Sequence, residues 1–193
     1  NEPGSKNPNN YTGSIVIPAT ITVDDVTCNV TAIGKKAFRS STITSISLPE
    51  GLMSIGEEAI CKTNITEITV PNSVTTLEQY AIGQNSQLKT IHIGESGGGS
   101  TWGNWVFWRS SGGYDVYMVC DIMPTLPDEY TFDDSHASKI YVKSELVDTY
   151  KADQWWGQHT ILPFGTEYID FTVDGIKYTQ TADDEVSLTY AKS

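Results

Sequence analysis

The chain has 193 residues, of which 38% are hydrophobic and 10% aromatic, and its formal net charge is −12 at pH 7. This charge argues against a nucleic-acid partner, because phosphates are bound by clustered Lys and Arg, and against an anionic membrane surface, which attracts polybasic segments. No stretch of about 18 consecutive apolar residues occurs, so the sequence predicts no transmembrane segment.

The chain begins with a polar segment, residues 1–10, which is predicted to be a linker. It lacks the apolar region of a signal peptide, so the chain is expected to be either intracellular or a processed piece. Three cysteines lie far apart, and their odd number argues against a complete disulfide framework. They are expected to be small buried hydrophobic residues: Cys28, Cys61 and Cys120.

The first predicted strand covers residues 14–18. Two β-rich arms follow around Asp24 and Asp25, with apolar and polar residues alternating along each arm. A short polar turn between alternating arms is typical of a hairpin. We therefore predict a hairpin insertion over residues 20–30, inside the first of a series of repeats.

One sequence motif, called the repeated phrase below, then occurs in three copies, over residues 30–38, 52–60 and 74–82. Its small residue returns every 22 positions, and a short apolar alternation follows each copy. A fixed period of this size is typical of a solenoid, in which each unit buries its apolar face against its neighbours. The equivalent positions are Ala37, Ala59 and Ala81 in the phrase and Ile46, Ile68 and Ile91 in the strands.

Within one repeat, Ile46 and Leu48 alternate with serines, so the apolar pair faces one side of a strand. Pro49 ends the strand because it has no N–H to donate. In the phrase itself, Ile33 and Phe38 have the spacing of one face of a short helical turn, and Gly34 is expected to take a positive φ.

The pattern continues with less regularity. Residues 102–107 match the repeated phrase and precede a strand over 116–118, while 95–101 is a flexible insertion. A fifth unit keeps Phe132 and a strand around Ile140.

A terminal cap is predicted over residues 143–163, with a short helix over 143–152 that ends before Asp153. Solenoid ends need such a cap, because an open end exposes a slice of core. Residues 164–193 contain a hairpin with an Asp-Gly turn, over 171–178, and a third strand over 186–190.

These observations predict a solenoid, mostly β, with a parallel sheet, short helical turns and a C-terminal β-hairpin appendage, and the resemblance given next implies that it is a leucine-rich repeat solenoid. The Ile-Gly-x-x-Ala-Phe turns and the Leu-x-x-Ile-x-Leu-Pro strands resemble the BspA-like class of leucine-rich repeats, over about residues 11–163. In proteins of this kind a hairpin like that of residues 173–178 precedes a strand like that of residues 11–18. The resemblance therefore implies that 164–193 begins a following module.

The resemblance also implies a right-handed superhelix, display outside an anaerobic bacterial cell, and adhesion to host proteins. On these grounds we expect an extracellular or cell-surface location, anchored at the outer membrane or secreted.

The sequence shows no catalytic motif. The three histidines lie in unrelated segments, and the Asp133–His136 stretch has no second cluster of metal ligands. The glycines at 97–99 lack the Lys-Ser/Thr of a phosphate loop. We therefore expect no enzymatic activity, no metal and no cofactor.

The best candidate surface consists of the outward strand residues, which form two columns across the predicted sheet. Tyr is favoured at recognition surfaces because it offers a large contact area at a low entropic cost. One column is Val16, Ser47, Thr69, His92, Tyr117 and Tyr141, and the other is Ser14, Ser45, Glu67, Thr90, Asp115 and Lys139.

Two tryptophans, Trp105 and Trp108, lie outside the repeat's core positions and are the second candidate. Exposed indoles stack on sugar rings, whereas buried ones supply apolar area where the repeats degrade.

The sequence thus predicts a non-enzymatic binding module for a protein or glycan. The alternatives are a carbohydrate-binding accessory protein that uses the tryptophans, and a structural spacer.

Overall fold

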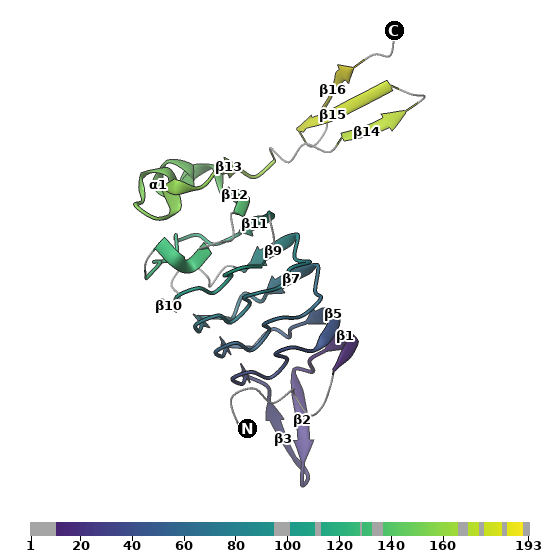
Figure 1. Ribbon diagram of the computed structural model, residues 1–193, viewed down its shortest axis with the longest axis vertical. Coiled ribbons are helices and arrows are strands. Elements are labelled where there is room, and N and C mark those ends of the chain that lie inside the picture. Colours follow the sequence, from purple (N-terminus) through teal and green to yellow (C-terminus); the bar gives the residue numbers. More distant parts are fainter. Residues whose placement is uncertain are drawn as a thin grey trace.

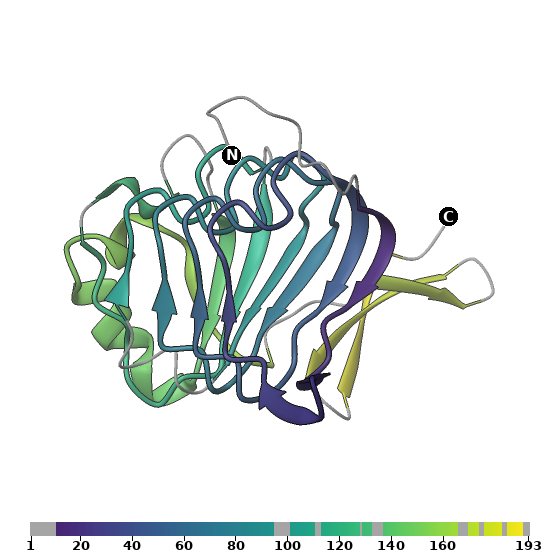
Figure 2. The same ribbon diagram turned by 90° about the horizontal axis from the view of Figure 1, so that it is seen from below.

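Figures 1 and 2 show a computed structural model of the chain, in which the repeats lie one above another along the longest axis. The structure describes residues 11–94, 101–110, 113–127, 129–132, 137–165, 170–173, 176–182 and 185–190.

The long strands of successive repeats form a parallel sheet of five strands, in which neighbours along the chain lie side by side. Its strands are β7 (Glu67–Val70), β9 (Thr90–Ile93), β11 (Tyr114–Met118), β12 (Ala137–Val142) and β13 (Ile161–Pro163). Their register aligns one buried aliphatic residue from each strand: Ile68, Ile91, Val116, Ile140 and Ile161. These side chains are at most 2% exposed, as the alternating pattern predicts.

The sheet is interrupted between the first two repeats, where the sequence predicts a continuous one. Strand β1 (Thr12–Val16) pairs in parallel with β5 (Thr42–Ser47), but β5 and β7 belong to separate sheets. At the β7–β9 junction, the Gly94 N–H donates to the Val70 carbonyl at 3.0 Å. The equivalent residue one repeat earlier is Pro71, which has no N–H to offer to Leu48. The β5–β7 junction therefore lacks one of the hydrogen bonds that join β7 to β9.

A second parallel sheet lies on another side of each repeat and was not predicted. It consists of two-residue strands: β4 (Ala32–Ile33), β6 (Ser54–Ile55), β8 (Thr76–Leu77) and β10 (Thr101–Trp102). The second residue of each strand is buried, and these residues align across the sheet in the order Ile33, Ile55, Leu77 and Trp102.

The predicted short helical turns are wrong for the first four repeats, whereas the turn of the fifth is a short 3-10 helix, η2 (Glu129–Phe132). The phrase after each short strand forms consecutive turns in which alternate N–H groups donate to the next repeat. Lys36, Phe38 and Ser40 donate to Glu57, Ala59 and Cys61 at 2.8–2.9 Å. The turns therefore join repeats as a strand ladder would, whereas a helix would direct these bonds within one repeat.

The positive φ expected at Gly34 falls two residues later, on non-glycine residues. Their φ angles lie between 52° and 59°, and they recur at Lys36, Glu58, Tyr80 and Trp105. Glycine has another role here. A Cβ on Gly56 would lie 2.9 Å from the Lys35 nitrogen, so the close approach of the preceding repeat requires the absence of a side chain.

A column of buried polar residues follows the turns: Ser41, Thr63, Asn85 and Ser110. The Asn85 amide donates to the Ile60 and Ile82 carbonyls at 2.8 and 2.7 Å, and its oxygen accepts from the N–H and hydroxyl of Thr63. Asn85 therefore joins two repeats and uses its full hydrogen-bonding capacity without contact with water.

The strands β2 (Thr20–Val23) and β3 (Val26–Asn29) pair antiparallel as a hairpin. Asp24 and Asp25 have φ angles of 49° and 61°, as a two-residue hairpin turn requires. Cys28 lies on this hairpin and is exposed, so the prediction of three buried cysteines is wrong for Cys28 and confirmed for the other two.

Short helices follow the last repeats. They are η2 (Glu129–Phe132), η3 (Ser144–Leu146), α1 (Val147–Ala152) and η4 (Trp156–Gln158). Tyr150 and Trp156 are fully buried, and the Trp156 ring lies 5.7 Å from Trp102 in an edge-on contact. The Trp156 Nε1–H donates to the Pro124 carbonyl at 2.9 Å. These aromatic side chains fill the core where the aliphatic repeat pattern ends.

The strands β14 (Asp170–Val173), β15 (Ile176–Ala182) and β16 (Glu185–Tyr190) form a three-stranded antiparallel sheet. The predicted Asp-Gly turn at 174–175 and residues 95–100 of the insertion predicted over 95–101 lie outside the described residues, while Thr101 belongs to β10.

Candidate functional site

The predicted aromatic column forms a stack of rings on the outward face of the long strands. The register places Thr69 opposite His92, His92 opposite Tyr117, and Tyr117 opposite Tyr141. The His92 and Tyr117 ring centroids are 4.9 Å apart with 18° between the planes, and those of Tyr117 and Tyr141 are 4.8 Å apart with 11°. We call His92, Tyr117 and Tyr141 the aromatic ladder. Parallel strands about 4.8 Å apart impose this stacking distance.

The three rings differ in exposure. His92 is exposed and Tyr117 is half-buried, whereas Tyr141 is only 2% exposed. Tyr141 therefore supports the ring of Tyr117 and does not itself present a face to solvent. The part of the ladder that a partner can contact consists of His92 and Tyr117.

The second predicted column is aligned in the same way. Glu67 lies opposite Thr90, Thr90 opposite Asp115, and Asp115 opposite Lys139. Glu67 is exposed, and the other three are half-buried. This column runs beside the aromatic ladder, so charged and aromatic groups share one face of the sheet.

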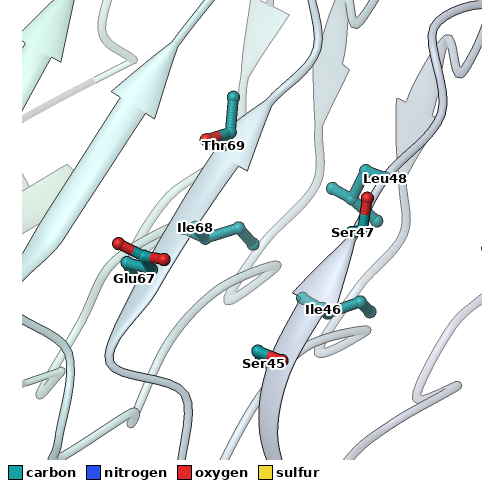
Figure 3. A pocket seen from close by; sticks show the side chains of 7 residues that line it. All are labelled: Ser45, Ile46, Ser47, Leu48, Glu67, Ile68 and Thr69. Carbon is teal, nitrogen blue, oxygen red and sulfur yellow. The ribbon is translucent and has the colours of Figure 1, made fainter. Parts of the chain in front are cut away.

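The break between β5 and β7 opens a slot in this face, shown in Figure 3. Its volume is about 310 Å³. Ile46 is 7% exposed and Ile68 is 1% exposed, so they give the slot an apolar floor. Glu67 lies along one strand and Ser47 along the other. We call this the β5–β7 slot, lined by Ser45, Ile46, Ser47, Leu48, Glu67, Ile68 and Thr69.

The second candidate, the tryptophan pair, lies on the turns. Trp105 stacks on Tyr80 from the preceding repeat, with centroids 5.2 Å apart, and contacts Tyr130 from the following one at 6.1 Å. The Arg109 guanidinium lies 4.4 Å from the centroid of the Trp108 ring. Sugar stacking needs a free ring face, and here Tyr80 covers one face of Trp105 while the Arg109 guanidinium lies over the ring of Trp108. The geometry therefore supports packing more than glycan binding.

The described residues contain no group of three or more His, Cys, Asp or Glu side chains that could hold a metal ion. His92 belongs to the aromatic ladder, and His159 packs edge-on against Phe132 with centroids 4.9 Å apart. The Asp133–His136 stretch lies outside the described residues.

Burial keeps two acidic groups protonated. Desolvation raises the pKa of the Cys61 thiol to about 11, and it raises the pKa of the Tyr150 phenol well above its ordinary value. Cys61 is therefore a thiol at neutral pH and not a nucleophilic thiolate.

None of the described helices is both long enough and apolar enough to cross a membrane.

The profile of the BspA type leucine rich repeat region matches residues 16–122 in six copies, which is more than half of the chain. The chain belongs to this family. None of the curated proteins matches it. Leucine-rich repeat domains are generally protein-interaction modules, and the BspA-like family is associated with surface and secreted proteins.

In this BspA-type chain, sequence reasoning identified the columns but missed the slot between β5 and β7. The sequence difference at that junction is Pro71, which stands where the next repeat has Gly94, a donor to the neighbouring strand.

Proposed function

We propose that this chain is a non-enzymatic BspA-type module that binds a protein partner through the outward face of its long strands. The stacked His92–Tyr117 pair carries the proposal, since it places two aromatic groups side by side on a polar sheet. Stacking orients both rings before a partner arrives, so little side-chain entropy is lost on binding. The neighbouring Glu67, Asp115 and Lys139 supply charges for specificity.

We further propose that residues 11–163 form one right-handed solenoid domain, that 1–10 is a linker, and that 164–193 belongs to a following module. The family's association with surface and secreted proteins supports an extracellular or cell-surface location and a role in adhesion.

The test is selection of peptide ligands by the purified chain from a phage-displayed library, followed by calorimetry. We expect the enriched peptides to lose at least about ten-fold in affinity for a His92→Ala/Tyr117→Ala double variant, because interface aromatics carry much of the binding energy. Tyr130→Ala, which removes an exposed ring of η2 away from the long strands, is the matched control and should bind as the wild type does.

If the peptides bind the His92→Ala/Tyr117→Ala double variant as tightly as they bind the wild type, the proposed binding face is contradicted. Loss of binding with Trp105→Ala or Trp108→Ala instead would favour the turns and the carbohydrate-binding alternative. If no variant changes the binding of any ligand, the spacer alternative is favoured.

A further inference from the structure

We propose that the β5–β7 slot receives a lysine side chain of the protein partner. This inference rests on the proposed function and names the chemistry of the partner, which would present a basic segment to the outward face of the sheet. The slot and the aromatic ladder lie on the same face, on neighbouring strands, so one polypeptide reaches both.

The floor of the slot suits an aliphatic stem. Ile46, Ile68 and Leu48 are apolar, and they line a space of about 310 Å³ that opens to solvent between two strands. Lysine carries a flexible four-carbon stem that packs on apolar surface while its ammonium group stays at the rim.

The rim suits a cation with several donors. The Glu67 carboxylate, the Ser47 and Thr69 hydroxyls and the slot's backbone oxygens all accept hydrogen bonds, and an ammonium group offers three donors and no acceptor. None of the described residues that line the slot is basic, and the net charge of the chain is −12, so the surrounding field attracts a cation.

Other occupants fit less well. An anion would be repelled by Glu67, and a purely apolar side chain would desolvate Glu67 without pairing it. An inserted β-strand needs about 4.8 Å to each neighbour. The two repeats cannot separate that far, since the Asn64 N–H donates to the Ile43 carbonyl at 3.0 Å and the turns beyond are hydrogen-bonded.

The test is an NMR titration of the isoleucine methyl groups with the peptide acetyl-Gly-Lys-Gly-amide. We expect saturable shifts at Ile46 and Ile68 and none at Ile161, which lies at the other edge of the sheet. Matched peptides with norleucine or Nε-acetyl-lysine keep the stem and remove the charge. They should bind at least about five-fold more weakly, as loss of a charge-assisted hydrogen bond implies.

Glu67→Gln keeps the shape of the rim and removes its charge. It should lower the affinity for the lysine peptide by about five-fold. Glu145→Gln is the control, because it neutralises an exposed carboxylate of η3 that lies outside the slot and outside both columns. Ser47→Leu fills the slot and should abolish the shifts. Thermal unfolding of each variant verifies that it is folded.

If the three peptides bind with equal affinity, or if Ile46 and Ile68 show no shifts, the proposal that the slot receives a lysine side chain is overturned. Library peptides that require His92 and Tyr117 but bind Glu67→Gln as they bind the wild type would also reject the slot, while the proposed function stands. Peptides that shift Ile46 and Ile68 yet are indifferent to His92 and Tyr117 would support the slot and contradict the proposed face.

Discussion

The junction between the first two repeats and the junctions that follow it differ on one side only. On the turns, Lys36 and Phe38 donate to the next repeat in the same way that Glu58 and Ile60 do one repeat later. On the long strands, β7 and β9 are paired while β5 and β7 are not. The same repeat is therefore hydrogen-bonded to its neighbour along the turns and open along the strands.

This difference shows how a repeat array acquires a site without any catalytic motif. At this junction Pro71 offers no donor to Leu48, and the long strands are separate while the turns stay hydrogen-bonded. The open junction leaves a slot between polar side chains, with the buried Ile46 and Ile68 beneath them.

The largest expected effect comes from truncating one core isoleucine at each kind of junction. Ile91→Ala, in the paired region, should lower the free energy of unfolding by about 4 kcal/mol, because it leaves a closed cavity. Ile46→Ala, beside the slot, should cost about 2 kcal/mol, since the site is already partly open. Urea denaturation measures both, and equal losses would contradict the comparison.

The contribution of the turns to stability can be tested at the buried side-chain amide of Asn85, which joins two repeats. Asn85→Ala should lower the free energy of unfolding by about 3 kcal/mol, because it leaves the buried Ile60 carbonyl without its Asn85 donor and the Thr63 N–H without its acceptor. Gln87→Ala, on the same turn but exposed, should change it by less than about 0.5 kcal/mol. A small loss with Asn85→Ala would mean that the turns do not hold the repeats together.

Much of the stacking could be predicted from the sequence, because the fixed period and the alternation of buried and outward residues determine which side chains align. The predicted columns from Thr69 to Tyr141 lie in that register. The turn geometry could not be predicted, since residues such as Lys36 and Trp105 take a positive φ that is sterically unfavourable for them. Inter-repeat hydrogen bonds stabilise that backbone, and they depend on partners 21 or more residues away.

The exposure of the candidate site residues was equally beyond the sequence. Tyr117 and Tyr141 occupy equivalent outward positions, yet one is half-buried and the other is buried. The pattern predicts the side of the strand on which a residue lies. It does not predict which other segments cover that residue.

Thiol reactivity offers a smaller test of the closed turns. In the native protein, Cys28 should react rapidly with a thiol reagent at pH 8, whereas Cys61 should stay protected until the protein unfolds. Because burial raises the pKa of Cys61 to about 11, its stabilising contribution is complete below about pH 9 and is lost as the pH rises through 11. A Cys61→Ala variant should show a weaker decline in stability over that range. Rapid labelling of two thiols at pH 8 would contradict the closed packing.

The smallest expected change in stability is also the most specific for the slot. Pro71→Ala supplies the N–H that the junction lacks, and pairing with Leu48 should add about 1 kcal/mol, partly offset by greater freedom in the unfolded chain. The variant should also lose the isoleucine shifts caused by the lysine peptide. Unchanged shifts would mean that Pro71 does not keep the slot open.

Amide hydrogen exchange across the two junctions tests the central claim most directly. In the wild-type protein, the Gly94 amide, which is bonded to Val70, and the Phe38 amide, which is bonded to Ala59, should be strongly protected. The Leu48 amide, at the open junction, should exchange at least about a hundred-fold faster. Equal protection of Leu48 and Gly94 would show that β5 and β7 are paired, and the slot would then not exist.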